Sequence, residues 1–138
     1  MRGPEEKQET FYSYVSQEDR VPKDHPLRKL RQMVDPILES MSRQFNQMYA
    51  ERGRPSIPPE YLLRALLVQI LYTIRSERLL MEQLDYNLLF RWFVGLSMDD
   101  KVWDHSVFSK NRDRLLEGDI ATLFLEKVVT MAREKGLL

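Results

Sequence analysis

The chain has 138 residues, of which 43% are hydrophobic and 30% charged, ordinary values for a globular protein with a buried core. It contains no cysteine, which excludes disulfides and thiolate zinc sites. With only His25 and His105, a histidine-rich metal site is not expected either. The 21 basic and 21 acidic side chains balance. A strongly basic composition is therefore absent, and any DNA-binding surface must gather its cations on one face.

The sequence predicts neither export nor a membrane span. Residues 1–10 are mostly polar and charged and lack the apolar run of a signal peptide. The most apolar stretch, Tyr61 to Tyr72, is about a dozen residues long and contains Arg64 and Gln69, whereas a spanning helix needs roughly 20 apolar residues. We therefore expect a buried core helix in a cytoplasmic protein.

The first half of the sequence predicts helices interrupted by proline. Residues 11–15 form a short aromatic segment, interpreted as an extended arm against the body of the protein. From Leu27 to Met48, apolar residues recur at three- and four-residue spacing, which is typical of an amphipathic helix. Pro36 is expected either to kink this helix or to begin a second one, because proline cannot donate the helical hydrogen bond. Residues 53–56 then predict a loop.

The second half predicts a series of short helices. Pro58 and Pro59 open an apolar helix, in which Glu60 and Arg64 are one turn apart and are expected to pair. Further helices are predicted over residues 76–86, 88–94, 104–116 and 120–136, with Asn87 and Asp104 as caps and Gly95 as a stop.

No alternating strand pattern of convincing length interrupts these helices. We therefore predict an all-α fold, a compact bundle of about six or seven mostly short helices. Residues 1–10 are expected to be a loose, flexible tail, and residues 11–138 a single domain.

Several motifs follow one another in a fixed order along the sequence. They are Gly53-Arg54-Pro55-Ser56-Ile57-Pro58-Pro59-Glu60, Arg75-Ser76-Glu77-Arg78, Leu88-Leu89-Phe90-Arg91-Trp92-Phe93-Val94-Gly95-Leu96 and Trp103-Asp104-His105-Ser106-Val107-Phe108-Ser109-Lys110-Asn111-Arg112-Asp113-Arg114-Leu115. In this order the chain resembles the N-terminal domain of InsH-like DDE transposases from bacterial insertion sequences, and the resemblance extends over residues 11–133.

The resemblance implies a helical domain that recognises the terminal inverted repeats of a mobile element in double-stranded DNA, in the bacterial cytoplasm at the nucleoid. It also implies a ribonuclease-H-like catalytic domain whose first aspartate would lie shortly beyond Leu138. We therefore expect a DNA-binding fragment without the catalytic carboxylates, which is not an enzyme by itself and needs no metal or cofactor.

The helix predicted to follow Asp104 has two distinct faces. At about 100° per residue, Phe108 and Leu115 share one face, and Lys110 and Arg114 lie on another with Ser106. A recognition helix in a helix-turn-helix-like unit needs this arrangement, with an apolar side for docking and cations turned toward DNA.

The alternative is a solvated helix face, because Asp113 and Glu117 partly neutralise the cations. Arg112 lies near the apolar side and is interpreted as the partner of a buried acid. Arg75 and Arg78 either bind phosphates or form a salt bridge, in which Glu77 or Glu82 would hold Arg78. The candidate DNA-binding residues are Arg75, Arg78, Ser106, Ser109, Lys110, Asn111 and Arg114.

Other conspicuous residues receive structural interpretations. Trp92, Phe93 and Trp103 are expected in the core rather than stacked on bases. Arg52 and Arg54 are assigned to a connector rather than to a basic loop. The acids Asp99, Asp100 and Asp104 are read as loop and cap residues, because two-metal chemistry needs carboxylates that converge from rigid elements.

Two alternative functions remain open at this point. The chain could act through protein contacts, pairing with itself or with a full-length transposase through residues 27–48 or the final helix, residues 120–131. It could also be a decayed remnant of a transposase without a present role.

Overall fold

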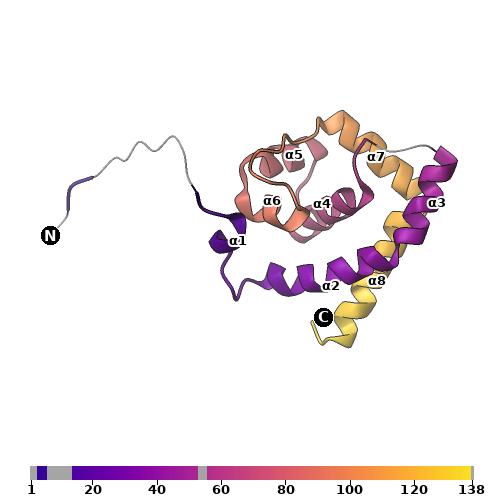
Figure 1. The fold of residues 1–138 in the computed structure, drawn as a ribbon, viewed down its shortest axis with the longest axis horizontal. Helices are drawn as coiled ribbons and strands as arrows, with labels where there is room; N and C mark the ends of the chain where they lie inside the picture. The colour runs from indigo at the N-terminus through magenta and orange to yellow at the C-terminus, as the bar shows by residue number, and fades with distance from the viewer. Residues whose placement is uncertain (1–2, 6–13, 53–55, 138) are drawn as a thin grey trace.

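The structure is a computed structural model that describes residues 3–5, 14–52 and 56–137. Within these ranges it contains eight α-helices and no β-strand, which confirms the all-α prediction (Figure 1). No described helix combines the length and hydropathy that a membrane crossing requires. The helices are α1 (Gln17–Arg20), α2 (Pro26–Ser40), α3 (Ser42–Arg52), α4 (Pro59–Leu71), α5 (Glu77–Tyr86), α6 (Leu88–Val94), α7 (His105–Glu117) and α8 (Ile120–Glu134).

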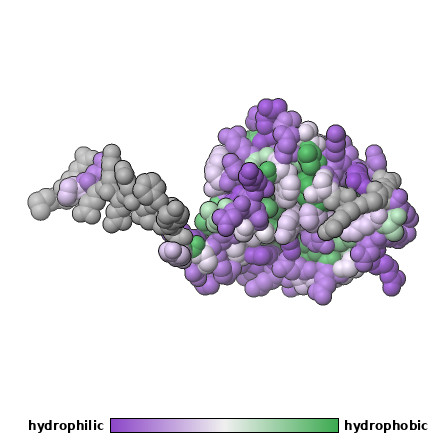
Figure 2. All heavy atoms as spheres, turned by 45° about the horizontal axis from the view of Figure 1, so that its top comes forward, coloured by the Kyte–Doolittle hydropathy of each residue, from purple (hydrophilic) through white to green (hydrophobic). Residues whose placement is uncertain are grey.

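The helices enclose one contiguous core. α2 packs against α8, α8 against α7, and α4 lies against both α6 and α7, while α5 covers α6 and α7 (Figure 1). Four fully buried phenylalanines come from four different helices, which shows that both halves of the chain contribute to the same core. They are Phe45, Phe93, Phe108 and Phe124. On the surface, polar side chains dominate the face seen in Figure 2, with apolar groups showing between them.

Of the two outcomes predicted for Pro36, the start of a second helix at this residue is wrong, because the break between two helices comes later in the chain. Pro36 lies inside the continuous helix α2, which ends four residues later at Ser40, with Met41 as its C-cap. Both Pro36 and Gln32, whose carbonyl the proline leaves without its helical donor, lie on the exposed side of α2. The actual break coincides with two serines: Ser40 Oγ donates to Ile37 O at 2.6 Å and Ser42 Oγ donates to Glu39 O at 2.8 Å. These hydroxyls satisfy carbonyls at the end of α2 and so favour its termination there.

The central helix α4 is buried along its first ten residues and exposed at its end. Leu62, Leu63 and Val68 are inaccessible to solvent, whereas Ile70 and Leu71 are largely exposed. Arg64 pairs with Asp35 of α2, with 2.9 Å between Nη2 and Oδ1, and not with Glu60 as predicted. Arg64 therefore pairs with a residue that is distant in the sequence and not with the predicted neighbour on its own helix.

Side-chain caps begin both α5 and α6, and the cap predicted at Asn87 is confirmed. Ser76 Oγ accepts from Leu79 N at 3.1 Å, and Asn87 Oδ1 accepts from Phe90 N at 3.1 Å. Gly95 ends α6 with φ +107°, and a Cβ at this position would lie 3.2 Å from the Tyr61 ring. Glycine is therefore required both by the left-handed backbone and by the close approach of α4.

A buried arginine holds the segment that follows α6. The Arg91 side chain is only 2% exposed and has no carboxylate partner. Its Nη1 donates to the carbonyls of Leu84 (2.8 Å) and Asp85 (3.2 Å) at the end of α5. Its Nη2 donates to the carbonyls of Ser97 and Asp100, the latter at 2.6 Å. One guanidinium thus ties the C-terminus of α5 to the loop that leads to α7.

The short helix α1, which was not predicted, attaches to α6 through a polar cluster around Trp92. Glu18 accepts hydrogen bonds from Trp92 Nε1 at 2.7 Å and from the Arg28 guanidinium. The guanidinium carbons of Arg28 and Arg31 lie 5.0 and 4.5 Å from the centre of the Trp92 ring, within range of a cation–π interaction. The hydrogen bonds from Arg28 and then from Trp92 hold the pKa of Glu18 below its ordinary value.

The aromatic segment before α1 does not pack on the protein where the structure describes it. Tyr14 is fully exposed and Val15 is about half exposed. The remainder of that segment, together with most of the predicted tail, lies outside the described residues.

Replacing Arg91 by methionine should destabilise the fold by about 2–4 kcal/mol, because carbonyls now bound by the guanidinium would lose their donor in a buried site. Arg91→Lys should be intermediate, since an ammonium keeps the charge but cannot span both carbonyl pairs. Urea unfolding measures the change. Lys101→Ala, an exposed position in the adjoining loop, should change stability by less than about 0.5 kcal/mol; equal losses for Arg91→Met and Lys101→Ala would contradict this role.

The depressed pKa of Glu18 predicts a local response to acid. A carboxylate whose folded-state pKa is lowered stabilises the fold above its unfolded pKa, and this contribution disappears as the pH falls through the folded-state value. The indole N–H resonance of Trp92 should therefore shift below about pH 4.3, before global unfolding. In Glu18→Gln the shift should be absent; an unchanged acid response in that variant would refute the assignment.

Candidate functional site

The structure brings the N-terminal ends of α5 and α7 together. Arg78, in the first turn of α5, lies with its Nη2 3.1 Å from Nε2 of His105, the first residue of α7. A guanidinium has only donors, so Arg78 is the donor in this contact and His105 Nε2 its acceptor. The sequence interpretation that Glu77 or Glu82 would hold Arg78 is therefore wrong: the partner of Arg78 comes from a different helix.

Both helix ends are capped by side chains. Ser76 caps α5, and Asp104 Oδ2 accepts from Ser106 N at 3.0 Å at the start of α7, as predicted. The Ser106 hydroxyl donates to the same carboxylate oxygen. These bonds from Ser106 lower the pKa of Asp104, which keeps the cap ionised. The positive ends of two helix dipoles thus point into one region of the surface.

Several of the predicted residues are exposed on or next to these two helices. Arg75 and Arg78 are exposed at the start of α5, and Ser106 and Lys110 are exposed in the first half of α7. Ser109 lies between them and is half-buried. We call Arg75, Arg78, Ser106 and Lys110 the α5–α7 surface. Arg78 is in the first turn of α5 and contacts the first residue of α7, so this cation lies beside two helix N-termini, an arrangement suited to anions.

Two predicted residues lie elsewhere. Asn111 is only 5% exposed, and its Nδ2 donates to Ser56 Oγ at 3.0 Å and to Val107 O at 2.8 Å. Arg114 is half-buried and lines a hollow with Gln44 and Gln47 of α3. Both side chains therefore connect α7 to the segments on its other flank. The spacing along α7 alone did not reveal this, because burial depends on which helices pack beside each position.

Arg112 is a structural residue, as its position near the apolar side predicted. It forms an ion pair with Glu77 of α5, and the two side chains are 28% and 21% exposed. Arg112 Nη2 also lies 3.1 Å from Asp113 Oδ1. The pair joins α5 to α7 next to the Arg78–His105 contact and so fixes the relative position of the two helix ends.

The aromatic residues are part of the core, as expected. Trp92 and Phe93 are buried, and Trp103 is partly buried against Tyr61, with 6.3 Å between ring centres. Arg91, between two of the apolar residues of α6, is the residue whose role sequence reasoning missed. The available signal was a single charge inside an apolar run, which indicates a buried and hydrogen-bonded cation.

Two aspartates after α6 accept hydrogen bonds from backbone N–H groups. Asp100 Oδ2 accepts from Ser97 N at 2.8 Å, and Asp104 caps α7, which confirms their interpretation as loop and cap residues. Among the described residues, no three histidine, aspartate or glutamate side chains are placed to hold a metal ion.

Arg112→Ala should destabilise the fold by about 1–2 kcal/mol, because Glu77 would keep its charge in a half-buried site without its partner. In the Glu77→Gln background the same substitution should cost clearly less, which a double-mutant cycle by urea unfolding measures. Additive losses would show that the ion pair does not couple the two helices.

The family comparison agrees with the sequence resemblance at a broader level. A family model described as "Transposase domain (DUF772)" matches residues 15–114, from the segment before α1 into α7. Neither a curated protein nor a solved structure gives a match. The matched range contains all four residues of the α5–α7 surface and covers more than half of the chain. The protein therefore belongs to the DUF772 transposase domain family.

Proposed function

We propose that this protein binds double-stranded DNA through the α5–α7 surface and recognises the terminal inverted repeats of an insertion sequence during transposition. The observation that carries the proposal is the convergence of two capped helix N-termini with exposed cations, joined by the Arg78–His105 contact. Membership of a transposase domain family supports DNA as the anion. The InsH-like group is the proposed subfamily.

In this proposal α5 and α7 have different tasks. Arg75 and Arg78 bind phosphates, assisted by the backbone N–H groups at the start of the helices. The first half of α7 enters the major groove, where Ser106 and Lys110 reach base edges. Helices α5, α6 and α7 thereby act as a helix-turn-helix-like unit, in which the N-terminal residues of the last helix recognise the DNA sequence.

The charge distribution along α7 supports an end-on approach. Lys110 is exposed in the first half, whereas the exposed acid Asp113 lies in the second half. Arg112, in the second half, is held by Glu77 and Asp113, so Lys110 is the cation that the first half offers to DNA and the helix would approach with its N-terminal end. This local asymmetry makes DNA binding compatible with a net charge of zero.

The proposed role is recognition and not catalysis. The α5–α7 surface offers cations, a hydroxyl and backbone donors, groups that bind a phosphodiester without cleaving it. Asp100 and Asp104, the nearby acids, are engaged by backbone N–H groups. A protein with this role would be found at the bacterial nucleoid.

Fluorescence anisotropy against the inverted repeats that flank the gene tests the proposal. The Arg78→Ala/Lys110→Ala double variant should bind at least about tenfold more weakly. Because Arg78 binds phosphate in this proposal whereas Lys110 reaches a base edge, the slope of log K against log salt should fall by roughly one unit. Arg43→Ala/Lys135→Ala is the matched control, because it removes two exposed cations from α3 and the end of α8.

Circular dichroism and urea unfolding of both double variants separate loss of binding from loss of fold. Repeat-selective binding by the parent protein that is weakened only in the Arg78/Lys110 variant supports the proposal. Equal weakening in both variants, or equal affinity for repeat and scrambled duplexes, would overturn it.

A further inference from the structure

Helix α8 exposes one of its faces to solvent. One side of α8 buries Ile120, Phe124 and Val128 against α2 and α7. The opposite side carries a strip that faces solvent, which we call the α8 strip; its members are spaced by three and four residues, and so lie on one face of the helix. The α8 strip consists of Thr122, Glu126, Val129, Thr130 and Arg133.

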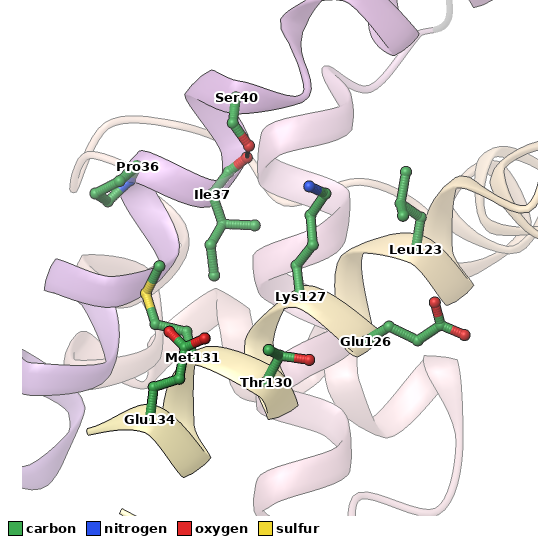
Figure 3. Close-up of a pocket in the computed structure, with 9 residues that line it drawn as sticks. All are labelled: Pro36, Ile37, Ser40, Leu123, Glu126, Lys127, Thr130, Met131 and Glu134. Atoms are coloured by element: carbon green, nitrogen blue, oxygen red, sulfur yellow. Dashed lines mark hydrogen bonds between the residues drawn. The ribbon is translucent and has the colours of Figure 1, made fainter. Parts of the chain in front are cut away.

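A hollow flanks this face on each side. The first, about 390 Å³, lies between α8 and α2; Figure 3 shows Lys127 rising toward Ser40 on α2 while Glu126 points away from it. The second, about 540 Å³, is mainly apolar and lies between α8, the start of α2 and the end of α4. Hollows beside an exposed helix face are grooves that the side chains of a second helix can fill.

Exposed apolar side chains surround the second hollow. Val129 of the α8 strip is 40% exposed, and Ile70 and Leu71 at the end of α4 are 57% and 48% exposed. Leu137 borders the same hollow and is also exposed. A contiguous apolar group of this kind on a surface marks an interface.

The charges on the α8 strip indicate which partner fits. Glu126 and Arg133 have opposite signs, are two helical turns apart, and form no ion pair within the described part of the chain. An antiparallel copy of α8, related by a twofold axis between Val129 and Thr130, would place Glu126 opposite the partner's Arg133. The same operation would place Arg133 opposite the partner's Glu126. A parallel copy would instead oppose like charges.

We propose that the protein forms a homodimer by antiparallel packing of the two α8 strips. Each strip supplies its own complement, so the contact is isologous and closes at two copies. A stable interface buries about 800 Å² on each partner, more than one helix face provides. Ile70 and Leu71 therefore extend the contact across the apolar hollow. The α8 strip shares no residue with the α5–α7 surface, so a dimer keeps two DNA-binding surfaces.

Charge reversal tests both the partner and its orientation. Glu126→Arg gives a strip with two cations, and Arg133→Glu gives a strip with two anions. In sedimentation velocity over a concentration series, each single variant should dimerise about tenfold more weakly than the parent, because two like-charge pairs replace two ion pairs. An equimolar mixture of the two variants should form a heterodimer, since every cross pair is then complementary. The Glu126→Arg/Arg133→Glu double variant should dimerise as the parent does.

Circular dichroism checks that each variant is folded, which is expected because both positions are exposed on a helix. The Lys110→Ala variant serves as the matched control and should dimerise normally even if its DNA binding is lost. A parent protein that stays monomeric would overturn the proposal, and so would a parent dimer that tolerates both single reversals. Failure of the mixed variants to associate would also overturn it, since another segment or a different partner would then cover the α8 strip.

Discussion

The buried guanidinium of Arg91 is the interaction on which the arrangement of the second half of the molecule depends. Burying an unpaired cation is costly, and it is tolerated only where hydrogen bonds replace the lost water. Here backbone carbonyls from the end of α5 and from the following loop supply those bonds. The α5 carbonyls also carry the negative end of a helix dipole, which favours a cation. The position of the loop, and with it the start of α7, follows from this one side chain.

The contacts between α5 and α7 are a consequence of that placement. Once the loop returns the chain beside α5, Glu77 meets Arg112 and Arg78 meets His105. Two N-terminal helix ends are then held side by side on a surface with exposed cations. A protein without net charge can in this way present a locally attractive site to a polyanion. The fold therefore places cations together on one surface, although the composition as a whole has no excess of positive charge.

Features that depend on neighbouring residues could be predicted from the sequence. The caps Asn87 and Asp104 and the stop at Gly95 follow from short-range hydrogen bonding and backbone geometry. Features that depend on distant residues could not. Arg64 is four residues from Glu60 but binds Asp35, because α2 and α4 come together only in the folded protein. Asn111 lies beside Lys110 in the sequence, yet a contact with Ser56 accounts for its burial. The sequence thus identified the helices that carry the proposed surface, but which of their side chains are exposed could be decided only with the packing known.

The most direct test of the account is to map the DNA contact on the protein by backbone amide NMR. The full chain would be titrated with a duplex of the flanking inverted repeat and, separately, with a scrambled duplex. The predicted result is that the largest shift changes occur at residues 75–78 and 105–110, with small changes along α8, and that the repeat produces them at lower concentration. Changes centred on α2 or α8, or an identical response to both duplexes, would contradict DNA recognition by the α5–α7 surface.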